Sequence, residues 1–335
     1  MTSAHVAARP RLRHGTIISR SHENAVLAMV GDTCYDISVE EGSKETLLEL
    51  KRYLDGTYTP EQIAASLGLP EEDVVEVVET FARLDLLADP VRTDRVARES
   101  FLRKIDQTVT MWRRQISYHP LFAALETGNA RVEVLHGLMI ETSHFVRSAP
   151  THIATALAHC TDPRWRAMLT NYLVEECDHE RYVLQVTTAM GYDPERVRSA
   201  NPVIGTTSLI ANLCRIARET TLGYFLCLRL LEGQAESRSQ AIASLRHIAK
   251  RYGFGPEIVE PIARHALIDV EAGHASLLDE ALEGFDALDA REVHLAVNAI
   301  HDLKHSLDQF YDQLLQYYVN PTSYVPRPLI DYFCL

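Results

Sequence analysis

The spacing of apolar residues divides the chain into two parts with different predicted secondary structure. Residues 14–38 hold short β-rich runs between polar turns, which predicts two or three strands. Residues 43–87 predict three helices, the second of which begins at Pro60 after a Thr59 N-cap and ends at Gly68. Helical periodicity then dominates most of the remaining chain and predicts about seven further helices. The pattern indicates a mainly α protein in which a small α+β domain precedes a helical bundle.

The predicted elements also suggest domain boundaries, with the change between the two parts at residues 88–95. We expect a flexible N-terminal tail at residues 1–13, an α+β domain at 14–90, a helical bundle at 96–320 and a C-terminal tail at 321–335. Strands with three short helices suggest a winged-helix domain, a class that often binds DNA. Its third helix, however, has a single basic residue, Arg83, and five acidic ones: Glu71, Glu72, Asp73, Glu76 and Glu79. Because DNA phosphates would repel this acidic helix, we do not expect DNA binding.

Composition excludes further classes of function. The chain has 46 acidic and 33 basic residues, a formal net charge of −13, which argues against nucleic-acid binding and against binding to an anionic membrane surface. The six cysteines form no CxxC motif and indicate reduced thiols in the cytoplasm. The N-terminus lacks the apolar core of a signal peptide. Charged residues interrupt the most apolar region, 208–232, so we expect no transmembrane segment.

Polar residues within the apolar stripe of a predicted helix are the first candidates for a site. In the helix expected over residues 169–191, Glu176 falls at the centre of the apolar face and His179 lies about 60° away. Glu175 lies at the edge of that face and is a weaker candidate. Buried carboxylate and imidazole groups are costly unless they share a partner. That partner is either a metal ion or an internal salt bridge, and this pair alone does not decide between them.

Two further helices contribute residues of the same kinds. Glu232 ends a helix that is apolar nearly all round, while His265 and Asp269 share one face of a later apolar helix. Three helices that each direct acids or imidazoles inward predict a metal held inside the bundle. Carboxylate and imidazole ligands without thiolate suit iron or manganese. Two arginines expected on the helix of Glu232, Arg218 and Arg229, are candidates for anchoring a substrate carboxylate and equally for ordinary surface residues.

The same angular test rejects another pair of histidines. His301 and His305 are four residues apart, but both lie far from the apolar stripe of their helix, so we expect them to face solvent.

The helical part resembles the haem-oxygenase-like diiron oxidases, a superfamily that includes the thiaminase-like and PqqC-like proteins. The resemblance covers about residues 100–320 and lies in ETSHFVRSAP (141–150), EECDHERYVLQVTTAMGYDPE (175–195), LGYFLCLRLLEG (222–233) and HALIDVEAGH (265–274). It implies a seven-helix haem-oxygenase-like bundle. The metal ligands that it implies are Glu176, His179, Glu232, His265, Asp269 and His274.

One position departs from the family pattern His-x3-Asp-x2-His. The second histidine is replaced by Ala272, and on a regular helix His274 points almost opposite to His265. A π-bulge near Gly273 would bring His274 round. Glu141 and His144, on the early helix, are the substitutes otherwise available. The sequence therefore leaves open whether the site binds one metal ion, two or none.

The resemblance implies an oxidase or oxygenase of specialised biosynthesis that binds two ferrous ions and uses dioxygen through a peroxo-diferric species. Family reactions of this type are N-oxygenation of amines, desaturation and oxidative C–C cleavage, which suggests an amine or amino-acid substrate. A metal-free PqqC-like or thiaminase-like enzyme, with the same residues moving protons, is the first alternative. A non-catalytic peptide-binding protein is the second.

The N-terminal domain resembles the small peptide-binding domains similar to PqqD, on the pattern LDGTYTPEQIAASLGLPEEDVVEVVETFARLDLL within residues 14–90. This resemblance implies that a substrate peptide or carrier adds a strand to the sheet edge. A purely structural or dimerisation unit is the alternative. The tail NPTSYVPRPLIDYFCL would cover a bundle end or contact a second subunit of a homodimer.

Overall fold

The computed structural model divides the chain into two compact units. The first comprises Met1–Thr93 with Arg103–Met111, and the second Asp94–Leu102 with Trp112–Leu335. The structure describes residues 8–13, 16–20, 25–30, 33–39, 44–88, 94–233, 235–331 and 333. Most of the predicted boundary at 88–95 and residues 1–7 of the predicted tail lie outside these ranges.

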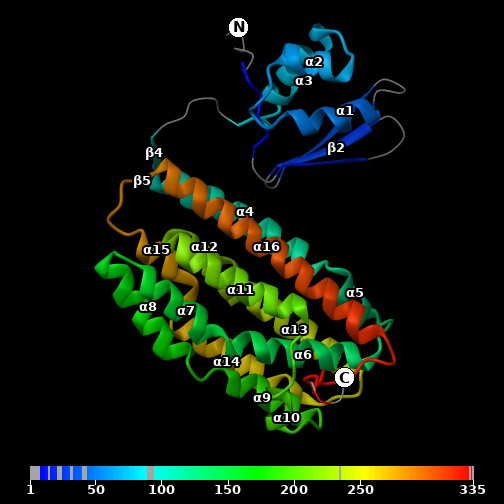
Figure 1. The fold of residues 1–335 in the computed structure, drawn as a ribbon, viewed down its shortest axis with the longest axis vertical. Helices are drawn as coiled ribbons and strands as arrows, with labels where there is room; N and C mark the ends of the chain where they lie inside the picture. The colour runs from blue at the N-terminus through cyan, green and yellow to red at the C-terminus, as the bar shows by residue number, and fades with distance from the viewer. Residues whose placement is uncertain are drawn as a thin grey trace. The chain divides into compact units, whose positions relative to one another are not determined.

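The first unit is a three-stranded antiparallel sheet followed by three helices (Figure 1). Its strands pair in the order β1-β2-β3, so β1 and β3 are the edges. The second helix has the expected ends, because Thr59 and Gln62 form a capping box and Gly68 adopts a left-handed φ of 67°. The predicted strands and helices are confirmed as β1 (Ile17–Arg20), β2 (Ala25–Val30), β3 (Thr33–Ser38), α1 (Lys44–Leu50), α2 (Pro60–Leu67) and α3 (Glu71–Arg83).

The second unit is a helical bundle, in which α16 runs along α11 and α12 (Figure 1). The predicted mainly helical fold is confirmed. The helix α4 (Arg98–Ser117) is shared, since its residues Arg103–Met111 group with the first unit. The remaining helices of the second unit are α5 (Pro120–Thr127), α6 (Val132–Arg147), α7 (Ala149–His159), α8 (Pro163–Glu176), α9 (Glu180–Ala189), α10 (Pro194–Arg198), α11 (Ile204–Glu219), α12 (Thr221–Glu232), α13 (Ala235–Arg251), α14 (Glu260–Glu271), α15 (Leu277–Ala281) and α16 (Ala290–Val319).

These helices are more numerous than the seven expected, because breaks divide some of the predicted ones. The helix predicted over residues 169–191 is interrupted after Glu176 by a turn in which His179 N–H donates to the Glu176 carbonyl at 3.4 Å. Such i to i+3 bonding tightens the backbone relative to an α-helix. The prediction also missed two three-residue strands, β4 (Arg95–Ala97) and β5 (Ala287–Asp289), which pair antiparallel. Runs this short carry no readable alternation of apolar and polar residues.

A buried carboxylate joins three helices of the bundle. Glu141 of α6 is fully buried and accepts hydrogen bonds from the Tyr318 hydroxyl at 2.8 Å, the Thr206 hydroxyl at 2.5 Å and the Val203 N–H at 3.2 Å. These donors come from α16, from α11 and from its N-cap. Because each buried acceptor has a donor, the carboxylate contributes to packing without a metal.

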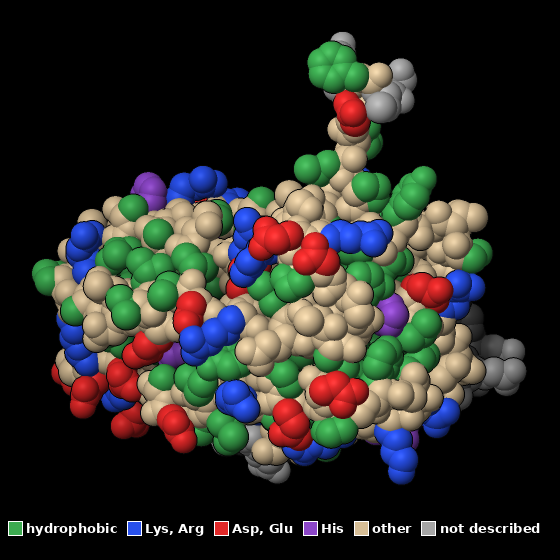
Figure 2. All heavy atoms as spheres, turned by 90° about the horizontal axis from the view of Figure 1, so that it is seen from below, with side chains coloured by type: hydrophobic (Ala, Val, Ile, Leu, Met, Phe, Trp, Pro, Cys, Tyr) green, Lys and Arg blue, Asp and Glu red, His purple; other side chains and the backbone are tan. Residues whose placement is uncertain are grey.

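The surface bears both kinds of charge. On the described face in Figure 2, Lys and Arg side chains lie among Asp and Glu and between hydrophobic side chains. Among the described residues, no helix is long and apolar enough to cross a membrane. The five described cysteines are free thiols.

Candidate metal centre

Acidic and imidazole side chains from separate parts of the chain converge inside the bundle. Glu176 ends α8 and His179 lies in the turn that follows, Glu232 ends α12, and His265 and Asp269 lie on α14. With His274, which follows α14, they form two groups in which one ligand atom from each residue lies within 4.8 Å of the others. The groups are Glu176, His179, His265 and Asp269, and Glu176, Glu232 and His274.

The first group gathers around one oxygen of Asp269. Its Oδ1 lies 3.4 Å from His265 Nε2 and 3.7 Å from His179 Nδ1. The two imidazole nitrogens are 2.9 Å apart, and His179 Nδ1 lies 3.0 Å from Glu176 Oε2. Two nitrogens and two carboxylates thus face a common centre, as tetrahedral or larger metal coordination requires.

The second group shares Glu176 with the first. Glu176 Oε1 lies 3.2 Å from His274 Nδ1, and the same nitrogen is 3.7 Å from Glu232 Oε2. Glu176 therefore turns one oxygen toward each group. Glu176 could therefore be a ligand that the two groups have in common.

A break in the helix brings His274 into the site. α14 ends at Glu271, and Gly273 adopts a left-handed φ of 77°, which only glycine adopts at low cost. The chain therefore turns, and the His274 side chain is 1% exposed, while Ala272 is exposed. The expected π-bulge is replaced by this helix end, so the regular-helix geometry does not apply to His274.

Other side chains form hydrogen bonds with the candidate ligands. Glu175 is 44% exposed, and its Oε2 lies 2.9 Å from His274 Nε2. The other ring nitrogen of His274, Nδ1, is therefore left to act as a ligand atom. The Tyr172 hydroxyl donates to Glu232 Oε1 at 2.6 Å. Arg238 donates to Glu232 Oε2 at 2.6 Å and to Asp269 Oδ2 at 2.5 Å. Sequence analysis missed Tyr172 and Arg238, because tyrosine in an apolar stripe and arginine on a polar helix are unremarkable by spacing.

The acidic side chains of the cluster lie close together and shift the pKa values of their neighbours. Burial raises the pKa of Glu176, and the Glu232 and Asp269 carboxylates raise it further. Burial alone would lower the pKa of His274, but Glu232, Glu175 and Glu176 outweigh it and raise that pKa to about 9. Protons on imidazole thus balance part of the negative charge, and a bound metal ion would replace them.

The donor atoms fit a metal ion. Among the described side chains, Asp269 Oδ1 and His274 Nδ1 are buried without a hydrogen-bond partner, and they lie 3.6 Å apart. Buried polar atoms are rarely left without a hydrogen-bond partner. The two unsatisfied atoms therefore indicate that a partner such as a metal ion binds between them. Oxygen and nitrogen ligands without sulfur suit iron or manganese.

Four other candidates lie outside both groups. Glu141 is bound as described above, and His144 is buried with its Nε2 unsatisfied. Arg218 is exposed on α11, whereas Arg229 is buried and donates to Asp279 at 2.8 Å. The expectation that Arg218 lies on the helix of Glu232 is wrong, because α12 begins at Thr221. Of the two rejected histidines, His305 is 57% exposed, while His301 is partly buried beside Trp112.

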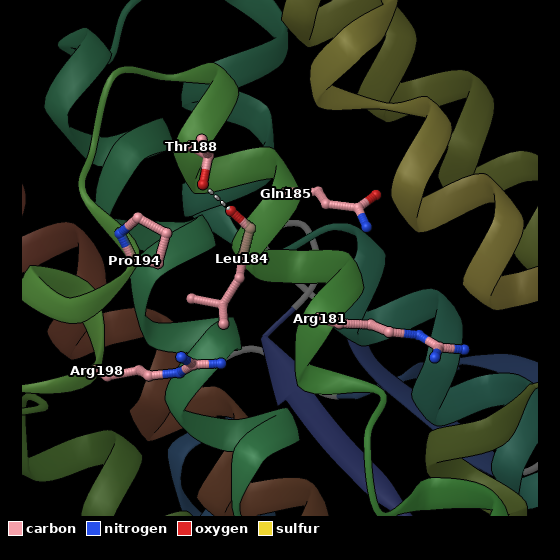
Figure 3. Close-up of a pocket in the computed structure, with 6 residues that line it drawn as sticks. All are labelled: Arg181, Leu184, Gln185, Thr188, Pro194 and Arg198. Carbon is pink, nitrogen blue, oxygen red and sulfur yellow. Dashed lines mark hydrogen bonds between the residues drawn. The ribbon is translucent and has the colours of Figure 1, made fainter.

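A surface pocket of about 400 Å³ lies beside α9 and α10 (Figure 3). None of its lining residues belongs to either ligand group, and its two arginines already have carboxylate partners: Arg181 pairs with Asp178 at 2.5 Å, and Arg198 with Glu195 at 2.9 Å. We assign it no role in the metal centre. Its lining residues are Arg181, Leu184, Gln185, Thr188, Pro194 and Arg198.

A buried histidine near the cluster predicts how stability depends on pH. His152 is 4% exposed, its Nδ1 lies 2.7 Å from the Tyr224 hydroxyl, and burial lowers its pKa to about 4. The folded state therefore binds fewer protons than the unfolded state between pH 6.5 and 4, so stability falls as pH decreases through this range. As the pH falls from 7.5 to 5, we expect His152 to lower the free energy of unfolding by about 2 kcal/mol.

Urea unfolding of the metal-free protein at these two pH values measures this loss. The variant His152→Asn keeps a polar atom for Tyr224 but cannot be protonated, so its loss should be smaller by about 2 kcal/mol. Equal losses in the variant and the wild type would contradict the assignment.

Comparisons with known proteins find similar chains that share the helical fold described above. A family model described as "Iron-containing redox enzyme" matches residues 136–305. The chain is similar to a solved domain of unknown function with a haem-oxygenase-like fold from Shewanella denitrificans, at 21% identity and a TM-score of 0.58, over 68% of this chain and 98% of that one. No curated protein matches it.

Two further solved structures share the fold. One is a CADD-like protein of unknown function from Nostoc punctiforme, with 11% identity and a TM-score of 0.53, over 66% of this chain and 100% of that one. The other is a TenA homologue from Pseudomonas syringae pv. tomato, with 12% identity and a TM-score of 0.51, over 64% of this chain and 93% of that one. At these identities the likeness concerns the fold alone.

Proposed function

The chain belongs to the family of iron-containing redox enzymes, and from this we propose that it is a non-haem diiron oxidase or oxygenase that uses dioxygen. The proposed ligands lie in the matched region, residues 136–305. They are Glu176, His179, Glu232, His265, Asp269 and His274.

The observation that carries the proposal is the position of Glu176 between two groups of ligands. Its two oxygens lie 3.0 Å from His179 Nδ1 and 3.2 Å from His274 Nδ1. A mononuclear site needs no carboxylate with an oxygen for each of two groups. The shared glutamate therefore favours two ions over one.

Bound ferrous iron would supply the electrons and open coordination positions for dioxygen chemistry. The chain's own residues would set the conditions for it. Glu175 orients the His274 ring through Nε2, and Tyr172 holds one oxygen of Glu232. Burial of Glu176, Asp269 and His274 keeps bulk water from these ligands.

We propose an amine or amino-acid substrate, and that the N-terminal unit binds a substrate-bearing peptide or carrier. Its sheet offers β1 and β3 as edges, and a partner strand could pair with either. A pull-down with peptides encoded beside the gene tests this, together with a variant lacking residues 1–90. If no peptide or carrier binds the full chain, the tethering proposal fails.

Anaerobic ferrous titration followed by exposure to oxygen tests the iron proposal, with optical and Mössbauer spectroscopy as readouts. We expect two irons per chain and a transient visible absorption band. One iron per chain without this band would contradict a dinuclear centre.

A metal-free enzyme in which the same residues move protons is the second candidate. The observation that favours it is Arg238, whose guanidinium already neutralises Glu232 and Asp269. Absence of iron binding in the titration would make this reading the leading one.

A further inference from the structure

Arg238 makes a fork of hydrogen bonds across the candidate centre. Its Nη2 donates to Glu232 Oε2 at 2.6 Å and its Nη1 to Asp269 Oδ2 at 2.5 Å. Its Nε donates to the Glu232 carbonyl, and the side chain is 15% exposed. Glu232 belongs to one ligand group and Asp269 to the other, so this single side chain contacts both.

The two carboxylates use this contact differently. At Asp269 the oxygen opposite the contact faces the cluster, whereas at Glu232 the contacted oxygen, Oε2, is itself the one 3.7 Å from His274 Nδ1. With Asp269 Oδ2 held by Arg238, Oδ1 is left among His179, His265 and His274 at 3.4–3.7 Å. Arg238 therefore determines which Asp269 oxygen is available as a ligand. At Glu232 the Tyr172 hydroxyl holds Oε1, so Arg238 and Tyr172 together restrict the rotation of that carboxylate.

We propose that Arg238 is a positioning residue for the metal centre, which orients one carboxylate ligand of each ion and thereby couples the two sites. This inference rests on the proposed diiron function. It extends that function with a residue outside the ligand set and with the prediction that both metal sites depend on it.

The chemistry of the side chain supports this role. A guanidinium is planar and presents its donors in a fixed fork, whereas a lysine ammonium is a single point charge that cannot bridge two carboxylates in the same way. The backbone leaves α12 at Gly233, which has a φ of 66°. Arg238 lies six residues after Glu232 and can therefore turn back onto it.

A different role for the same contacts predicts the opposite result. If Arg238 only neutralised the acids in place of a metal ion, it would compete with metal binding, and its removal would tighten binding. If it positions the ligands, its removal weakens binding, because loss of an outer partner typically costs 10–100-fold in metal affinity.

The experiment is a Co²⁺ titration of the full-length protein, which reports affinity and, through the d–d absorption bands, coordination. We expect the wild type to bind two Co²⁺ ions per chain. We expect R238Q to bind both ions about 10–100-fold more weakly, with altered d–d bands. The matched control is R246Q on the same helix, where Arg246 is 56% exposed and pairs with Glu260 at 3.6 Å. It should bind both ions as the wild type does.

R238K decides the question even if R238Q is too unstable to purify, because it keeps the positive charge beside the acids and loses the fork. Positioning predicts about 10-fold weaker binding of both ions by R238K. Wild-type affinity and spectra in R238K, or tighter binding by R238Q, would overturn the inference. If the wild type binds no Co²⁺, the proposed function fails and this inference with it, whereas wild-type binding with unchanged variants overturns the inference alone.

Discussion

Glu176→Gln should abolish binding of both metal ions, with a loss of affinity of at least about 100-fold. The amide removes the negative charge and leaves one carbonyl oxygen where two carboxylate oxygens face separate groups, at 3.0 Å from His179 Nδ1 and 3.2 Å from His274 Nδ1. Iron per chain after anaerobic reconstitution, measured by mass spectrometry, checks this result.

The neighbouring Glu175→Gln is the matched control, since it makes the same chemical change one residue away. Glu175 contacts only the far nitrogen of His274 in the centre, at 2.9 Å. We expect this variant to retain the ion of the first group and to bind the second about 10-fold more weakly. Two irons bound with wild-type affinity by Glu176→Gln would rule out the shared-carboxylate arrangement.

Gly137→Ala should lower the free energy of unfolding by about 3 kcal/mol, although alanine is the better helix former. A Cβ at this position of α6 would lie 2.3 Å from Tyr318 Cδ2, well inside van der Waals contact. The Tyr318 ring is 1% exposed and cannot move aside without disturbing its 2.8 Å hydrogen bond to Glu141. Urea unfolding of the metal-free protein measures the change.

Tyr318→Phe separates the two parts of this effect, because it removes the hydroxyl and leaves the ring in place. A hydrogen bond to a buried carboxylate is worth about 1.5–3 kcal/mol, so this variant should lose about 2 kcal/mol. A Gly137→Ala protein as stable as the wild type would mean that α6 and α16 are not packed as closely as the structure describes.

The angular test predicts candidate ligands from the spacing of residues along single helices. Glu176, His179, His265 and Asp269 do converge, because helical periodicity fixes which side chains share a face. The test remained valid for Glu176, His265 and Asp269 because they lie within α8 and α14. It also held for His179, which lies past the break after Glu176, because Cys177 and His179 keep right-handed helical backbone angles there. It failed for His274, which lies beyond a break.

The choice between Glu175 and Glu176 shows a second limit of periodicity. Neighbouring residues on a helix differ by about 100°, so the sequence ranked Glu176 above Glu175 and left Glu175 as a substitute ligand or an outer partner of the ligands. Only the fold brings Glu175 to His274, 99 residues later in the chain. Arg238 is a similar case, because its contacts depend on where α13 lies relative to α14.

The sequence by itself determined the mainly helical class, the three helices of the first unit with two or three strands before them, and the residues that the apolar stripes turn inward. These properties are local, since they follow from spacing, caps and turn residues within one element. The tertiary structure alone decided that Glu176 is shared by two groups, that Gly273 turns His274 inward, and that Arg238 joins Glu232 to Asp269. Such contacts depend on the packing of elements far apart in the chain, and no pattern within a single helix encodes them.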